Sequence, residues 1–330
     1  LPLMTLTGAG DTWHPVVTAN TTLTGYWLNW RFFLCTLWVL LGMTFASLLI
    51  WRNEDLSKDG HRGAAENDED PKLNLYSEET WRPCFKSLHP LWLLVFRSFA
   101  FFFLLLLLVY ALFIDGPRLL YYYTQWTFAL VTLYFSVGVM LSVHGCLTYR
   151  RNSKVGKVVN EESSAERGQY EGIHSRFNHP ADKLAYAFQI MYQVNAGAVM
   201  LTDCVFWFVI VPFLASKDYT ISPVTISMHS MNAVFLLGDA FLNCMRFPWF
   251  RIGYFFLWTI VYVLFMWLVH SCFDIWWPYP FLDLSSSYSP LWYFLVGVMQ
   301  FPCYGIFSLL LKIKHVLLSK WFPHSYECLR

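Results

Sequence analysis

The segment 224–245, VTISMHSMNAVFLLGDAFLNCM, carries four polar side chains in an apolar run: His229, Asn232, Asp239 and Asn243. At about 100° per residue of an α-helix, their spacing places all four within roughly a quarter of the helix circumference. The run is long enough to cross a bilayer, where a polar stripe is costly unless it faces partner helices or a wet cavity. The stripe therefore predicts a functional site or, alternatively, interhelical hydrogen bonds that only aid packing.

Thr124, in the segment YYYTQWTF at 121–128, is the hydroxyl that His229 can activate. Both segments are expected to begin at the outer face of the membrane, so the two side chains are expected at similar depth. A threonine hydroxyl becomes a strong nucleophile when a base takes its proton, and the free N–H groups at a helix start stabilise an oxyanion. We therefore predict Thr124 as nucleophile and His229 as base, with Gln125 beside them; the alternative is an ordinary threonine in a membrane helix.

Two acidic residues are predicted to lie deep in the bilayer. Asp239 follows His229 by about 15 Å along a helix, which is too far to orient its imidazole. Asp203 lies in the preceding apolar run and shares a helix face with Gln193. We expect these residues to form a buried polar network, a proton or ion path, or the floor of a pocket. The Thr–His pair is then a dyad that lacks the third carboxylate of a triad.

Several other chemistries have no motif in this chain. There is no HxxxH or HExxH pattern, no GxSxG elbow and no Gly-rich phosphate loop. The eight cysteines are scattered without a CxxC pair, so we expect neither zinc nor a disulfide framework. No basic cluster alternates with aromatic residues, which argues against nucleic acid as a partner. We therefore expect no metal and no cofactor.

The composition indicates a membrane protein, because 56% of the residues are apolar, 20% are aromatic and only 14% are charged. Only helices and closed barrels satisfy their backbone in lipid, and runs of this length predict helices. We expect an all-α, polytopic transmembrane bundle of about seven spans, in the endoplasmic reticulum or the plasma membrane. The expected spans are 32–51, 91–114, 120–141, 184–214, 224–245, 252–273 and 291–318.

The distribution of basic residues predicts the orientation. Connections 52–90, 148–183 and 246–251, together with the chain after 311, hold 19 of the 23 lysines and arginines. The positive-inside rule therefore places the N-terminus outside and the C-terminus in the cytosol, with Arg97 snorkelling to the cytosolic face. Asn20 begins a glycosylation sequon on the predicted outer side.

The chain is expected to form one membrane domain with polar extensions. Residues 1–30 form an exoplasmic arm, residues 31–318 the seven-span domain and residues 319–330 a cytosolic tail. The long cytosolic loops 52–90 and 148–183 are polar and charged, which predicts mobile segments. The connection after the sixth span is rich in aromatic residues and proline and lacks Lys and Arg, which predicts a lid or an interfacial aromatic belt.

Three motifs carry a resemblance to known families: YYYTQWTF at 121–128, MHSMNAVFLLGDAFLN at 228–243 and the aromatic segment ending in FLDL at 281–284. They resemble the rolling stone proteins and, through them, the androgen-induced membrane hydrolases, over roughly residues 90–315. The hydrolases are intramembrane threonine enzymes that cleave fatty acid esters of hydroxy fatty acids. The resemblance implies that Thr124 and His229 have the nucleophile and base roles. The TQW sequence is closer to the rolling stone pattern, which is associated with myoblast fusion.

Three functions therefore remain open. The first is an intramembrane hydrolase or acyl transferase that acts on a membrane lipid or another fatty-acyl ester. The second is a seven-span receptor or a fusion-associated surface protein that uses the polar stripe for contacts. The third is a transporter, which the deep acidic residues suggest; transporters commonly show broken helices or inverted repeats, and the sequence shows neither.

Overall fold

The computed structural model describes residues 20–63, 77–162, 183–214 and 223–328. Helices are the main regular structure in these ranges, beside two isolated β-bridges. The long helices are α2 (Trp30–Gly63), α3 (Pro90–Asp115), α4 (Tyr123–Glu162), α6 (Lys183–Val205), α9 (Ile252–Cys272) and α10 (Ser289–Trp321). The shorter helices are α1 (Thr24–Trp27), α7 (Pro223–Met228) and α8 (Met231–Leu242). A π-helical segment, η4 (Phe206–Leu214), extends α6, and four short 3-10 segments are η1 (Ser77–Thr80), η2 (Gly116–Tyr121), η5 (Trp249–Arg251) and η6 (Pro280–Leu282).

Five helical segments in the described ranges are long and apolar enough to cross a membrane. They are Trp30–Glu54, Pro90–Tyr121, Tyr123–Arg151, Trp249–Cys272 and Ser289–Trp321. An all-helical, multi-pass membrane protein is therefore confirmed at this level, while seven spans and their orientation stay predictions. The other two expected spans correspond to α6 with η4, which is rich in buried polar residues, and to the interrupted pair α7 and α8.

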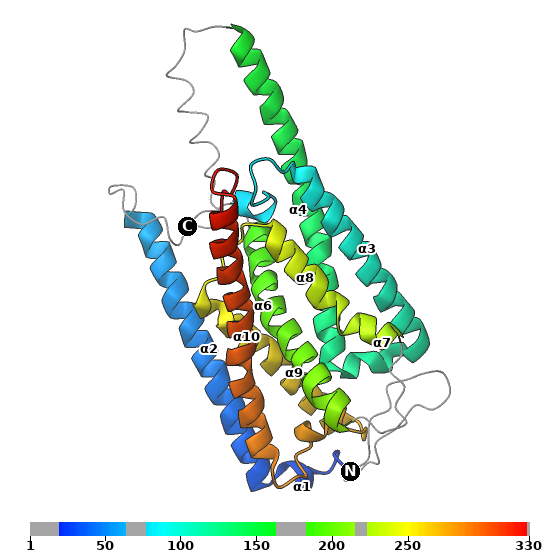
Figure 1. Ribbon diagram of the computed structural model, residues 1–330. Helices are drawn as coiled ribbons and strands as arrows, with labels where there is room; N and C mark the ends of the chain where they lie inside the picture. The colour runs from blue at the N-terminus through cyan, green and yellow to red at the C-terminus, as the bar shows by residue number, and fades with distance from the viewer. Residues whose placement is uncertain (1–19, 64–76, 163–182, 215–222, 329–330) are drawn as a thin grey trace.

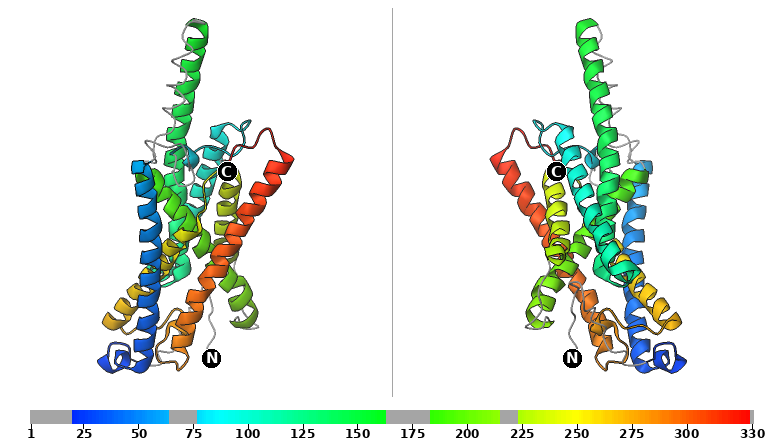
Figure 2. Two further views of the ribbon diagram at one scale, coloured as in Figure 1. Left: turned by 90° about the vertical axis from the view of Figure 1, so that its left-hand side faces the viewer. Right: turned by 90° about the vertical axis from the view of Figure 1, so that its right-hand side faces the viewer.

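Helix α6 is the centre of the bundle (Figure 1). It packs against α4 and α8 on one side and against α9 and α10 on the other. Helix α3 packs mainly on α4, and α2 packs on α9 and α10. The connection between α9 and α10 and the first described residues lie at one end of the bundle, whereas η1 and the last described residues lie at the other (Figures 1 and 2). We call the second end the tail end.

The segment that carries the polar stripe is broken, so the prediction of one continuous helix was wrong. Helix α7 ends at Met228 and α8 begins at Met231, with His229 and Ser230 in the turn between them. Ser230 has φ −136° and ψ −41°, outside the helical region. Asn243 lies just past the end of α8. The break removes the common face, since residues on either side of it no longer follow one helical repeat.

Arg97 does not snorkel to the membrane surface as predicted, because it pairs with Asp239 inside the bundle. Both side chains are fully buried, and Nε of Arg97 lies 2.6 Å from Oδ1 of Asp239. Arg97 also donates to the hydroxyl of Ser142 at 2.9 Å and to the carbonyl of Thr80 at 2.6 Å. Oδ2 of Asp239 accepts from the hydroxyl of Tyr134 at 2.5 Å and from Nδ2 of Asn243 at 2.8 Å. This network joins α3, α4 and α8.

The polar loops and the tail also differ from their predictions. Helix α2 continues to Gly63 and α4 to Glu162, so both long loops begin with helix; residues 64–76 and 163–182 lie outside the described ranges. The expected absence of disulfides was wrong, because Cys244 and Cys328 are bonded. The sequence gives no spacing signal for this pair, since the fold brings together cysteines 84 positions apart.

Helices α6 and α9 approach closely at Gly197. A Cβ atom at this glycine would lie 2.4 Å from the ring of Phe255, whereas a Cβ at Gly297 in α10 would meet nothing within 4 Å. The absent side chain of Gly197 thus permits the central contact between α6 and α9.

We expect Gly197→Ala to lower the free energy of unfolding by about 1–3 kcal/mol, because the added methyl overpacks the contact. Gly297→Ala is the matched control and should be neutral or stabilising by up to about 1 kcal/mol, since alanine is the better helix former. Unfolding in mixed micelles by titration with a denaturing detergent measures both. Equal effects of the two substitutions would contradict the close approach.

We expect Asp239→Asn to destabilise the protein by about 3–5 kcal/mol, because it leaves the Arg97 charge buried without a counter-charge. The double variant Arg97→Met, Asp239→Leu should recover part of this loss by removing both charges. Arg82→Gln serves as control, since Arg82 pairs with Glu327 at 3.2 Å in an exposed position and should cost less than about 1 kcal/mol. If Asp239→Asn and Arg82→Gln lower the free energy of unfolding by similarly small amounts, the buried ion pair does not stabilise the bundle as proposed.

Candidate functional site

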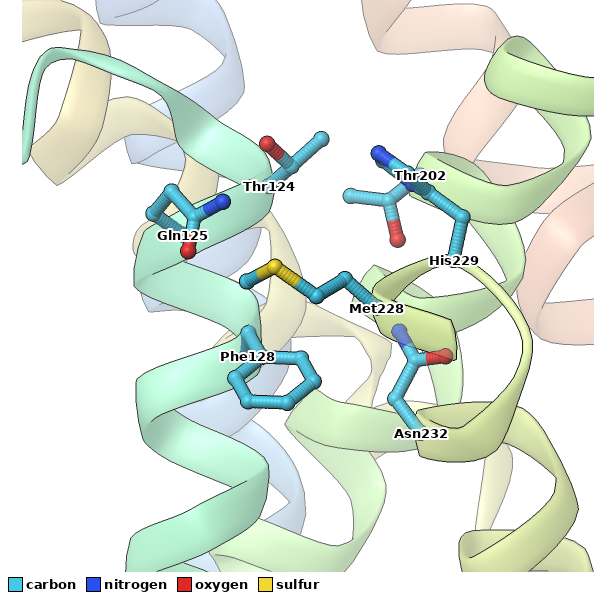
Figure 3. A pocket seen from close by; sticks show the side chains of 7 residues that line it. All are labelled: Thr124, Gln125, Phe128, Thr202, Met228, His229 and Asn232. Carbon is cyan, nitrogen blue, oxygen red and sulfur yellow. The ribbon is translucent and has the colours of Figure 1, made fainter. Parts of the chain in front are cut away.

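A narrow crevice opens where the first turns of α4 face the break between α7 and α8 (Figure 3). The crevice is too narrow to hold a water molecule, so side chains must move to admit a ligand. It is lined by Thr124, Gln125, Phe128, Thr202, Met228, His229 and Asn232. The structure therefore brings together four of the residues singled out in the sequence, from segments that are about a hundred positions apart.

Thr124 is the second residue of α4, which confirms the predicted position at a helix start. Its backbone N–H has no acceptor within the helix and instead points at the hydroxyl of Tyr279, 3.4 Å away. The side chain of Thr124 interacts with the same phenol. Burial raises the pKa of Tyr279 to about 12, although its hydrogen bonds with Thr124 oppose this rise, so the phenol is protonated at neutral pH. Tyr279 therefore holds Thr124 from the connection between α9 and α10.

The imidazole of His229 is positioned by the π-helical segment that follows α6. Its ring stacks on Phe206 with the centroids 3.7 Å apart and the planes 3° from parallel. Its backbone carbonyl accepts from the indole N–H of Trp207 at 3.0 Å. These contacts fix the ring, while its edge faces the crevice (Figure 3).

Thr124 and His229 face each other across the crevice but are not hydrogen-bonded in the part of the chain that the structure describes. In Figure 3 the methyl group of Thr124 lies on the side of His229, and its hydroxyl lies on the far side. A rotation about χ1 exchanges the two groups, because threonine has staggered rotamers of similar energy in a helix. Thr124 and His229 thus line the same crevice, but in the described part of the chain no hydrogen bond joins their side chains.

Asn232 links the crevice to a carboxylate. Its Nδ2 donates to Oδ1 of Asp203 at 3.3 Å, and the hydroxyl of Thr202, which donates to the carbonyl of Val199 at 3.0 Å, lies 3.4 Å from the same oxygen. The other oxygen of Asp203 is buried without a hydrogen-bond partner among the described residues. Asp203 therefore lies directly behind two wall residues of the crevice.

The other predicted residues lie away from the crevice. Nε2 of Gln193 donates to the carbonyl of Arg246 at 3.1 Å, and Asp239 belongs to the network of Arg97. Asn20 is exposed, and its side-chain carbonyl accepts from the backbone N–H and the hydroxyl of Thr22, at 3.0 and 2.6 Å. The four polar residues of the segment are thus divided between two places. His229 and Asn232 line the crevice, whereas Asp239 and Asn243 belong to the network of the buried ion pair.

Sequence reasoning missed several residues of the site. Thr202 precedes Asp203 in the chain, and Tyr279 belongs to the aromatic connection, so both stood next to recognised features. Phe206 and Met228 are apolar residues in apolar runs and gave no signal. A stacking partner of this kind emerges only when the tertiary contact is known.

No group of three histidine, cysteine or acidic side chains that could hold a metal ion is found among the described residues. No protein-family model matches the chain, and no curated protein or solved structure is similar to it. The resemblance to the rolling stone proteins and the androgen-induced hydrolases therefore rests on the three short motifs alone.

Proposed function

We propose that this protein is an intramembrane lipid ester hydrolase or acyl transferase, with Thr124 as nucleophile and His229 as general base. The observation that supports it is the crevice in which a threonine at a helix start faces a histidine whose ring is held by stacking. The two residues that the motif resemblance pairs are the two that meet here. The proposal includes seven spans, an exoplasmic N-terminus and a cytosolic C-terminus.

The chemistry follows from the two side chains. The hydroxyl of Thr124 attacks the ester carbonyl while His229 takes its proton, and the imidazolium then gives this proton to the departing alkoxide. The acyl group remains on Thr124 until water, or an acceptor alcohol, attacks it with His229 again as base. The backbone N–H of Thr124 lies beside the nucleophile at a helix start, and it is suited to stabilise the oxyanion once it leaves the hydroxyl of Tyr279.

Gln125 adds a polar group to the same wall. Its side-chain oxygen is buried without a hydrogen-bond partner among the described residues. An amide in this position can accept from a hydroxyl or donate to a carbonyl oxygen of a bound ester. Phe128 and Met228 also line the crevice, and an acyl chain packed against them would gain about 0.8 kcal/mol for each buried methylene group. The proposed substrate class, a fatty-acyl ester, rests on the motif resemblance.

The first test is labelling of membranes with a fluorophosphonate probe, which reacts with activated hydroxyl groups. We expect labelling of the wild type and a loss of at least about a hundredfold in Thr124→Ala and His229→Ala, because general base catalysis contributes about 10²–10⁴. Thr127→Ala is the matched control, since Thr127 is fully buried one turn further along α4 and does not line the crevice. Absence of labelling in well-expressed wild type, or equal labelling in Thr124→Ala, would contradict the proposed hydrolase.

Removal of the phenol that holds Thr124 tests how the nucleophile is controlled. We expect Tyr279→Phe to increase the rate of probe labelling by roughly two- to tenfold, because one hydrogen bond worth about 0.5–1.5 kcal/mol no longer competes for the hydroxyl. The comparison is made on the initial rate at equal protein. A lower rate would instead give Tyr279 a supporting role in the reaction.

One observation favours a second function, which is proton-coupled or ion-coupled transport. The break at His229 and Ser230 interrupts a membrane segment beside Asp203, and discontinuous helices near buried carboxylates are typical of transporters. In proteoliposomes with a trapped pH-sensitive dye, this function requires a proton flux that Asp203→Asn abolishes. No flux above that of empty liposomes would exclude proton coupling.

A further inference from the structure

Three cysteines meet at the tail end of the bundle. Cys244 follows α8 and is disulfide-bonded to Cys328 in the tail. Cys84 is fully buried between them: its backbone N–H donates to the carbonyl of Leu242 at 2.9 Å, and its carbonyl accepts from the N–H of Glu327 at 2.9 Å. The disulfide therefore closes the tail over a third, free thiol.

The remaining contacts of the tail are non-covalent and include backbone hydrogen bonds from Lys86 to Ser325 and from Glu327 to Cys84, together with the packing of Phe85 against Phe322 and Tyr326. The carboxylate of Glu327 lies 3.2 Å from Arg82 and 3.2 Å from Lys86, whose side chains are 54% and 59% exposed. Exposed ion pairs of this kind contribute little to stability. An isolated β-bridge joins Phe85 to Tyr326. The covalent bond is consequently the strongest link between the tail and the bundle.

A permanent disulfide is not expected at this end of the molecule. The tail end carries Arg82 and Lys86, which contact Glu327 of the tail and belong to a connection that the positive-inside rule assigns to the cytosol. Cytosolic thiols are kept reduced, and disulfides found there are usually transient, catalytic or redox-sensing. A disulfide at this end of the molecule is therefore expected to be reversible.

We propose that Cys244 and Cys328 form a redox-modification site, a reversible disulfide that latches the tail over Cys84. The reductant is a dithiol of the thioredoxin or glutaredoxin class. Its thiolate attacks Sγ of Cys328, the S–S bond breaks and Cys244 leaves as a thiolate that takes up a proton. The second thiol of the reductant then displaces Cys328, so that the reductant becomes the disulfide and the protein gains two electrons and two protons.

Reduction frees the tail, while the end of α8 stays anchored. Nζ of Lys314 donates to the carbonyls of Ala240 and Asn243 at 2.7 and 2.6 Å, and Asn243 donates to Asp239 at 2.8 Å, so the last turn of α8 keeps these contacts when the disulfide opens. Burial raises the pKa of the Cys84 thiol, which keeps it protonated and slow to react while the tail covers it. Alkylation of Cys84 therefore reports whether the tail is in place. This inference does not depend on the proposed hydrolase activity.

The test uses the full-length protein in native membranes, incubated in glutathione buffers of stepped thiol-to-disulfide ratio. Free thiols are blocked with one maleimide, disulfides are reduced, and the released thiols are labelled with an isotopically heavy maleimide for mass spectrometry. We expect Cys244 and Cys328 to be oxidised to the same extent and to titrate together as the ratio changes. We also expect alkylation of Cys84 to accelerate by about tenfold or more on reduction, as a local opening does.

One thiol and two variants provide controls. Cys303 is 1% exposed and lies in the apolar core together with Phe255 of α9, so its alkylation rate should not depend on the redox buffer. Cys328→Ser should make Cys84 react fast at every ratio, whereas Cys272→Ser, which removes an exposed free thiol, should preserve the wild-type titration. If Cys328→Ser does not fold, the proposal is still tested by the wild-type protein, in which the oxidation of Cys244 and Cys328 and the alkylation rate of Cys84 are followed together.

Three results would overturn the latch. One is that Cys244 and Cys328 are never oxidised in membranes quenched with maleimide. Another is that both stay oxidised at every ratio and are reduced only by reductant added outside intact cells, which would place a permanent disulfide on the exoplasmic side. The third is an unchanged alkylation rate of Cys84 when the pair is reduced.

Discussion

The ion pair between Arg97 and Asp239 is the interaction on which the arrangement of the bundle depends. Two charges that are fully buried lose several kcal/mol each of hydration, so the pair is favourable only when its remaining donors and acceptors are satisfied. Tyr134 and Asn243 supply these partners for the carboxylate, and Ser142 with a backbone carbonyl supplies them for the guanidinium. A shift of α3, α4 or α8 along its axis would break several of these bonds at once, so the pair fixes the register of all three helices.

That register has consequences at the other end of the same helices. Helix α4 contributes Tyr134 and Ser142 to the network and Thr124 to the crevice, and α8 contributes Asp239 to the network and Asn232 to the crevice. Because the hydrogen bond between Tyr134 and Asp239 joins α4 to α8, the network limits how far Thr124 and Asn232 can move apart. The break at His229 then turns the imidazole toward α4 and onto Phe206. The buried network around Arg97 and the crevice therefore share helices α4 and α8.

The sequence allowed the all-helical membrane class and the helix start at Thr124 to be predicted, because hydropathy identifies the helices. Thr124 and His229, which the sequence singled out together, line one crevice, while their equal depth in the membrane stays a prediction. The sequence did not allow the helix break to be predicted, since the segment contains no proline and its glycine lies further along. The partner of Asp239 was missed because snorkelling and burial compete for an arginine near a helix start, and only packing decides between them. The bond between Cys244 and Cys328 likewise depends on a tail that folds back.

The most direct test of the crevice is a cross-link between its two walls. Thr124→Cys combined with His229→Cys, treated with a short bifunctional maleimide, should give an internal cross-link in high yield, because both side chains line one narrow space. Thr124→Cys combined with Leu295→Cys, on the exposed face of α10, should give none under the same conditions. A cross-link in the first pair that is absent in the second is the predicted result; no cross-link in the first pair, in protein that folds and reacts at each single cysteine, would contradict the meeting of α4 with the break between α7 and α8.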